Sequence, residues 1–222
     1  MEKSPIRYSS LSLAIKYNCV LFPFDAAQFI RALPSDGYAL SEAAPGQPPL
    51  GTRLEVNGVI GRKGNIALRL DMSRQILAVQ AYTPKDALSE MDSIELLLKR
   101  EFNIENATLA LYYEVLADLV VQARKNPLTQ WSQQTEHVPI VQKAGEAFGT
   151  PVALWGVRFT PQGESPNQAN WLDIRLQPSI HAPTGFHSVE VVFRRARREE
   201  VFAFLRKFEE TLTSLVGFVE KE

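Results

Sequence analysis

Cysteine and histidine are almost absent from this chain. Cys19 is the one thiol among 222 residues, so an internal disulfide and a thiolate metal cluster are both excluded. Of the three histidines, His137 and His181 fall in expected linkers and His187 starts an expected strand. None has another histidine, cysteine or carboxylate at ligand spacing. The sequence therefore predicts no metal and no cofactor, and it offers no support for a catalytic centre.

The chain also lacks an excess of one charge and a long apolar run. Its 24 basic and 25 acidic residues leave a formal net charge of -1, so no general attraction to phosphate or acidic lipid is expected. No uncharged run reaches the roughly 20 residues that cross a bilayer, and the N-terminus MEKSPIRYSSLSLA lacks the apolar segment of a signal peptide. We expect a soluble cytoplasmic protein that does not bind membranes.

What the sequence does contain is an internal repeat. SLSLAIKYN (Ser10–Asn18) resembles NATLALYYE (Asn106–Glu114), and DAAQFIRALP matches DLVVQARKNP at Asp, Arg and Pro. Three further matches follow in the same order along both halves. They are LEVNGVI with VALWGVR, which share a Gly-Val pair, LRL with IRL, and LLKR with FLRK. We infer a duplication in which residues 1–103 and 104–222 each form a β-α-β-β-β-α repeat within one compact unit. This alignment makes Leu13 and Leu109 equivalent.

Periodicity and capping residues predict the elements of the first repeat. Side chains alternate over residues 10–21, which indicates a strand that buries its odd-numbered positions, Cys19 included. Asp25 is expected to cap a short helix that Pro34 ends, and Thr83 to cap a long helix that opens with proline. Between these helices we expect a loop at residues 41–52 and then three strands, at residues 53–60, 65–71 and 75–82. The turn GRKG joins the first two of these strands.

The second repeat is expected to contain the same elements with two insertions. Its linker, residues 128–150, includes VPIVQKAGEAFG, which has the pattern of an extra helix, and one strand loop is expanded to TPQGESPNQAN. A single helix is predicted over residues 197–220. Its apolar stripe is typical of packing against a sheet and consists of Val201, Leu205, Phe208, Leu212, Leu215, Val216 and Val219.

Two tandem β-α-β-β-β-α repeats that form one antiparallel sheet, with helices on one face, resemble the core of the TATA-binding protein family. The resemblance lies in the order of elements and implies an α+β saddle whose concave sheet face is bare. That family's Ser-Gly-Lys turn and Thr-Gly-Ala-Lys ending do not occur in the corresponding segment DMSRQILAVQAYTPKD, and its wedging phenylalanines have no counterparts. The resemblance therefore implies the fold and none of the family's binding residues.

The predicted bare face carries as many acidic as basic side chains. Alternation places on it Lys16, Arg53, Arg69, Arg175 and Arg194, together with Glu55, Asp71, Glu114, Asp173 and Glu190. Such interleaved charges are typical of cross-strand pairs, whereas a DNA-binding face needs an excess of cations to neutralise phosphates. The cluster RRARR, residues 194–198, is interpreted as a corner between strand and helix that Glu199 and Glu200 half neutralise.

Aromatic residues nevertheless make the same face a candidate contact surface. The residues that we assign to it are Tyr112, Trp155, Phe159 and Trp171, with Arg69, Arg175 and Arg194. Aromatic residues and arginine are enriched in protein interfaces, although a tryptophan at a partly covered strand end produces the same pattern. The leading hypothesis is a non-catalytic interaction module that binds a protein partner, or a second copy of the chain, through this face.

Two alternatives stay open. The first is nucleic-acid binding by a saddle-shaped sheet, which the balanced charge does not favour. The second is a small apolar ligand held between the sheet and the helices, where Ala14, Ala67 and Ala78 would leave room.

Overall fold

The structure of the protein is a computed structural model that describes residues 6–41 and 56–220. The fold is α+β, with one sheet of nine described strands in the order β2-β3-β4-β5-β1-β6-β9-β8-β7, all antiparallel to their neighbours. The strands are β1 (Ile6–Tyr17), β2 (Ala39–Leu40), β3 (Asn57–Lys63), β4 (Ile66–Asp71), β5 (Ile76–Gln80), β6 (Ala110–Gln122), β7 (Val157–Phe159), β8 (Trp171–Pro178) and β9 (Phe186–Arg195).

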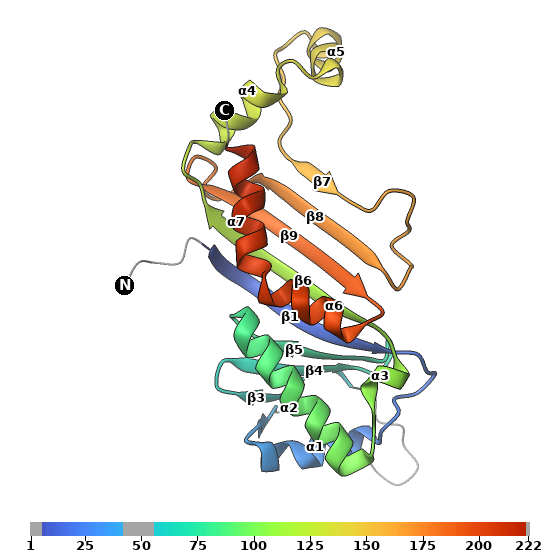
Figure 1. The fold of residues 1–222 in the computed structure, drawn as a ribbon. Coiled ribbons are helices and arrows are strands. Elements are labelled where there is room, and N and C mark those ends of the chain that lie inside the picture. Colours follow the sequence, from blue (N-terminus) through green and yellow to red (C-terminus); the bar gives the residue numbers. More distant parts are fainter. Residues whose placement is uncertain (1–5, 42–55, 221–222) are drawn as a thin grey trace.

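Three helices, α2, α6 and α7, cover one face of this sheet, whereas α5 lies away from it beyond the strand ends (Figure 1). The helices are α1 (Ala26–Ala32), the 3-10 turn η1 (Leu33–Asp36), α2 (Pro84–Phe102), α3 (Asn106–Leu109), α4 (Pro127–Thr135), α5 (Pro139–Phe148), α6 (Arg198–Arg206) and α7 (Phe208–Val219). Among the helices of the described ranges, none combines the length and the apolar character that crossing a membrane requires.

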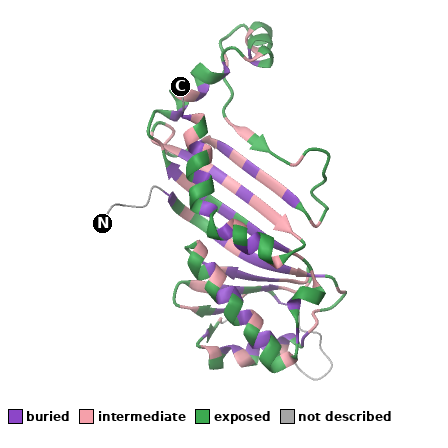
Figure 2. Ribbon diagram, in the orientation of Figure 1, coloured by how far each residue is buried: buried purple, intermediate pink, exposed green. Residues whose placement is uncertain are grey.

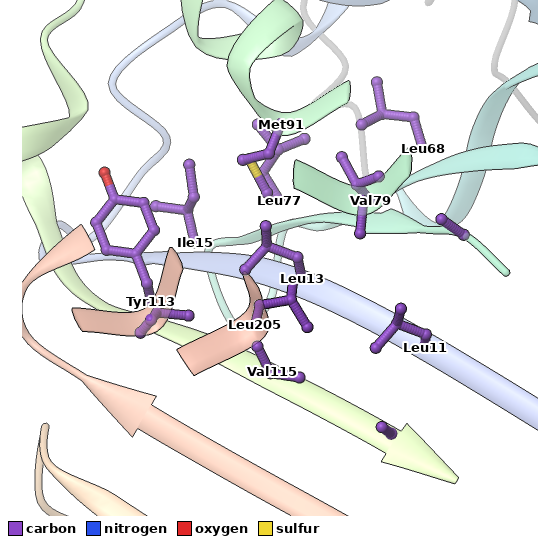
Figure 3. Close-up of a cluster of buried hydrophobic side chains, with 14 of the residues drawn as sticks. Leu11, Leu13, Ile15, Leu68, Leu77, Val79, Met91, Tyr113, Val115 and Leu205 are labelled. Atoms are coloured by element: carbon purple, nitrogen blue, oxygen red, sulfur yellow. The ribbon is translucent and has the colours of Figure 1, made fainter. Parts of the chain in front are cut away.

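The hydrophobic core lies between the sheet and these helices. Leu13 of β1 faces Val115 of β6 in register, and both are completely buried. Met91 from α2 and Leu205 from α6 approach the same cluster (Figure 3). Buried and less buried positions alternate along the central strands (Figure 2), because successive side chains of a strand point to opposite faces. We call the face that packs against the helices the helix side.

The predicted caps are confirmed. The Asp25 side chain accepts a hydrogen bond from the Gln28 amide at 2.8 Å, and the Thr83 hydroxyl oxygen accepts one from the Asp86 amide at 3.1 Å. The extra helix expected in the linker is α5. These local patterns succeed because a capping side chain satisfies backbone amides that have no partner within the helix.

Three boundaries differ from the sequence-based prediction. The first strand ends at Tyr17, so Cys19 is only half-buried and Leu21, expected in the core, is exposed. Strand β3 continues to Lys63, and the turn is made at Gly64, which has φ 58°. The single helix expected over 197–220 is divided into α6 and α7. The expected loop at 41–52 and the start of the strand expected at 53–60 lie largely outside the described residues.

The strand order is the same on either side of the sheet centre. Read outward, one half is β1-β5-β4-β3-β2 and the other is β6-β9-β8-β7, so the orders correspond over four strands and the two-residue β2 is additional. The residue correspondence that the repeat predicted is nevertheless wrong. Leu13 is completely buried within β1, whereas Leu109 ends the short helix α3 and is 37% exposed. The expected division between 103 and 104 lies in the connection between α2 and α3.

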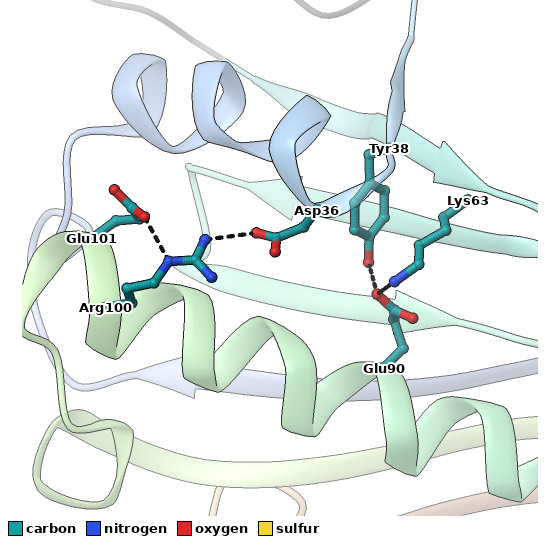
Figure 4. Close-up of polar contacts among 6 residues, drawn as sticks. All are labelled: Asp36, Tyr38, Lys63, Glu90, Arg100 and Glu101. Carbon is teal, nitrogen blue, oxygen red and sulfur yellow. Dashed lines mark hydrogen bonds and ion pairs between the residues drawn. The ribbon is translucent and has the colours of Figure 1, made fainter.

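On the helix side, α2 is joined to the first half of the sheet by a buried carboxylate. Glu90 accepts hydrogen bonds from the Tyr38 hydroxyl at 2.7 Å and from the Lys63 ammonium at 3.0 Å (Figure 4). Burial, together with this bond, raises the pKa of Tyr38. Near the other end of α2, Arg100 pairs with Asp36 at 3.1 Å. These contacts hold α2 and η1 in fixed relative positions on the helix side. No described helix covers the opposite side of the sheet (Figure 1).

Candidate functional site

The face of the sheet opposite α2, α6 and α7 is the candidate site, and we call it the open face. Strand register assigns to it Ser10, Ser12, Ala14 and Lys16 of β1, Arg69 and Asp71 of β4, Ala78 and Gln80 of β5, Tyr112, Glu114, Leu116 and Asp118 of β6, Trp171, Asp173 and Arg175 of β8, and Glu190, Val192 and Arg194 of β9. No helix of the described ranges lies over these side chains (Figure 1).

A single row of paired residues crosses this face. In order from β4 to β8 it consists of Arg69, Ala78, Ala14, Glu114, Arg194 and Trp171. Neighbouring strands are about 4.8 Å apart. The two alanines therefore separate the arginine of one half from the charged pair of the other half by three strand spacings.

The charges of the second half are neutralised across neighbouring strands. Arg194 binds Glu114 through Nε at 2.8 Å, and their side chains are 14% and 7% exposed. The remaining pairs are Arg158 with Asp173, Nε to Oδ1 2.8 Å, and Arg175 with Glu190, 3.0 Å. The hydrogen bonds from Arg158 also lower the pKa of Asp173. The prediction of cross-strand pairs is confirmed for these strands.

Arg194 also fixes a loop at one end of the open face. Its guanidinium lies 4.3 Å from the centre of the Tyr112 ring and donates to the carbonyl oxygens of Pro166 and Gln168 at 2.8 and 3.2 Å. Trp171, on the same row, is buried. At this end of the open face, the Tyr112 ring is therefore partly accessible to a partner, and the Trp171 ring is not accessible.

Two of the aromatic residues assigned to the open face are placed differently. Phe159 of β7 lies opposite Ile174 and so faces the helix side, which corrects its predicted position. Trp155 is 48% exposed but precedes β7, outside any strand. The misplacement of Phe159 follows from strand register. A shift of one residue along a strand turns the opposite set of side chains toward a given face of the sheet. Strand β7 is too short for its alternation to be recognised from sequence.

A depression of about 400 Å³ occupies the middle of the open face. Its floor includes Ser12, Ala14 and Ala78, and its lining includes Arg69 on one side and Leu116 on the other. Leu116 is 40% exposed and stands at the centre of the sheet, with Ser12 and Val192 as its cross-strand neighbours. Sequence reasoning placed Arg69 correctly and missed Leu116, although the alternation of β6 from Tyr112 onward contains that signal.

The alanines expected to leave room for a ligand between sheet and helices do not do so. Ala14 and Ala78 form part of the floor of the open-face depression. Ala67 is paired with Gln80 and faces the same way. The expectation of space beneath the helices at these positions is therefore wrong, because small side chains here shape the exposed side of the sheet.

The arginine cluster is a corner between strand and helix, as predicted. Strand β9 ends at Arg195 and α6 begins at Arg198. Arg195 lies 3.7 Å and Arg197 3.8 Å from the Glu200 carboxylate. Together with the pairs of Arg194 and Arg198, these contacts oppose every cation of the cluster with a carboxylate.

Within 6–41 and 56–220, no group of three or more His, Cys, Asp or Glu side chains is arranged to hold a metal ion. Burial raises the pKa of the Cys19 thiol, which works against thiolate formation. The chain matches no model of a known protein family and no curated protein.

Proposed function

We propose that the protein is a non-catalytic interaction module whose open face binds another protein, a second copy of the chain included. The observation that carries this proposal is the depression at the centre of the open face, with exposed Leu116 beside a polar rim. A leucine exposed in the middle of a sheet is a suitable anchor, because apolar side chains at the centre of an interface gain most from the exclusion of water.

The charge arrangement supports a protein partner over nucleic acid. Three arginines of the second half, Arg158, Arg175 and Arg194, are already bound to carboxylates on neighbouring strands. A phosphate backbone would have to compete with those carboxylates and would meet them as like charges. Affinity for nucleic acid comes mainly from cations that neutralise phosphates, and this face offers no excess of them.

The same proposal includes the origin of the fold. We infer that the halves arose by duplication and form a saddle of the kind seen in the TATA-binding protein family, with a shifted correspondence between residues. Leu13 pairs with Val79 on one side, and Val115 pairs with Phe193 on the other. Since each lies on the helix side of a central strand and is completely buried, Leu13 and Val115 are the equivalent positions under this proposal.

The proposal is tested with a matched pair of exposed leucines. Leu116 stands on the open face, and Leu96, 66% exposed, stands on α2 on the other side of the molecule. A photo-crosslinking residue at position 116 is expected to capture a protein, or a second copy, that the same residue at position 96 does not capture. The captured protein, once purified, is expected to bind Leu116→Glu at least about tenfold more weakly than wild type and Leu96→Glu with unchanged affinity.

Sedimentation velocity of the pure protein and of Leu116→Glu distinguishes a second copy from a different partner. Self-association through the open face predicts a dimer that the substitution at 116 dissociates and the one at 96 does not. Equal effects of the two substitutions, or capture of nucleic acid alone at position 116, would contradict the proposal.

A further inference from the structure

A second depression, of about 480 Å³, lies on the helix side where the end of β6 meets the last turns of α7. Val121 and Arg124 line it from the β6 side, and Thr213, Val216 and Glu220 from the helix. Its volume falls within the range of small-molecule sites. It shares none of its lining residues with the depression on the open face, so a ligand bound here is independent of the function proposed above.

The carboxylate of Glu220 gives this pocket a negative end. Glu220 is 8% exposed and accepts one hydrogen bond, at 2.8 Å, from the backbone amide of Arg124. Within residues 6–41 and 56–220, a titratable side chain that approaches it is His187, with Nε2 3.6 Å from Glu220 Oε1. A buried carboxylate without a cation is costly. Glu220 is also the C-cap residue of α7, where the helix dipole adds further negative potential.

The neighbouring His187 does not supply a positive charge to Glu220. His187 is completely buried, and its Nε2 lies 3.6 Å from Glu220 Oε1, too far for a hydrogen bond. Neither ring nitrogen has a hydrogen-bond partner in the described part of the chain. Burial lowers the pKa of His187 and outweighs the opposing effect of Glu220, so the ring is neutral at pH 7.

We propose that this pocket binds a small molecule with a primary ammonium group, which pairs with Glu220, and an alkyl chain, which lies along Val121 and Val216. An ammonium has three donors and no acceptor, and it forms strong charge-assisted bonds with a carboxylate.

The test compares n-hexylammonium with n-hexanol, which has the same chain and no charge, by ligand-observed NMR and calorimetry. Wild type is expected to bind n-hexylammonium saturably at millimolar concentrations and n-hexanol at least about tenfold more weakly. Glu220→Gln keeps the shape and the acceptor for Arg124 and removes the charge, and it is expected to lose this preference. Glu210→Gln makes the same change at an exposed position of α7 that does not line the pocket and is expected to behave as wild type.

A second variant separates loss of the site from loss of the fold. A Cβ atom at Gly217 would meet no other atom within 4 Å, and Gly217 lines the pocket, so Gly217→Leu fills the space without a clash. It is expected to remain folded by circular dichroism and to lose n-hexylammonium binding while Glu220 is intact. Retained binding by either pocket variant, equal affinity for n-hexanol, or no saturable binding by wild type would overturn the proposal.

Discussion

Arg198 at the start of α6 binds Glu95 in the middle of α2, with Nε 2.7 Å from Oε2. Glu95 also accepts from the Tyr113 hydroxyl at 3.1 Å, and Arg198 also pairs with Asp92. The guanidinium lies 3.7 Å from the centre of the Phe202 ring. This cluster joins α2, which covers one half of the sheet, to α6, which covers the other. Arg198 belongs to the basic run RRARR in the sequence, but in the structure it connects these two helices.

Arg198→Ala is expected to lower the free energy of unfolding by about 1 to 3 kcal/mol. The side chains of Arg198 and Glu95 are 27% and 16% exposed, and removing one partner leaves a poorly hydrated carboxylate. Arg197→Ala is the matched control, since Arg197 is 79% exposed in its pair with Glu200; it is expected to change stability by less than about 0.5 kcal/mol. Urea unfolding curves measure both, and equal effects would show that the cluster does not stabilise the fold.

The charge pairs of the open face are expected to differ in strength according to burial. Glu114→Ala leaves the largely buried Arg194 guanidinium, whose side chain is 14% exposed, without its carboxylate and is expected to cost about 2 to 4 kcal/mol. Arg175→Ala breaks a pair whose side chains are 43% and 45% exposed and is expected to cost less than about 1 kcal/mol. Thermal and urea unfolding of the two variants give this ranking, and the reverse order would contradict it.

Stability is expected to fall on acidification because of His187. Burial lowers its folded pKa below the ordinary 6.5, so between the folded pKa and 6.5 the unfolded chain binds more protons than the folded chain. The free energy of unfolding therefore rises with pH in that window, by up to about 1.4 kcal/mol per pH unit, and this contribution is complete above pH 6.5.

Unfolding free energies at pH 7.5 and 5.5 test this dependence against a variant. His187→Leu removes the titrating ring and is expected to show a smaller difference between the two pH values than wild type. His137→Leu, at a position whose ring is 83% exposed, is expected to keep the wild-type difference. An unchanged pH dependence in His187→Leu would assign the effect to other groups.

Two glycines are expected to respond in opposite directions to alanine. A Cβ at Gly156 would lie 2.6 Å from the Leu176 carbonyl oxygen, so Gly156→Ala must displace β7 and is expected to cost about 1 to 3 kcal/mol. Gly217 is within α7 and has open space around it, so Gly217→Ala is expected to stabilise by about 0.5 to 1 kcal/mol. The two melting temperatures should move apart, and a shift in the same direction would show that backbone space does not decide the effect.

The positions that could be predicted from sequence are those where the pattern is long. The buried side of β1 and the stripe of α7 follow from side-chain period alone. The orientation of β7 could not be predicted, because three residues give too few alternations to select a face. The same limit misplaced Phe159. Leu116 was missed for a different reason, since the alternation of the 13-residue β6 contains its signal.

The sequence by itself determined the caps of α1 and α2, the balance of charge and the apolar sides of the long strands and helices. These depend on interactions within a few residues along the chain. The sequence did not determine the full order of elements, because Asp118–Gln122, matched by the repeat to a helix, belong to β6. Only the tertiary structure decided which strands are neighbours, and therefore that Arg194 meets Glu114, that Arg198 meets Glu95, and that a pocket forms beside Glu220. Those contacts join residues far apart in sequence, and register across the sheet, which no local pattern encodes, brings them together.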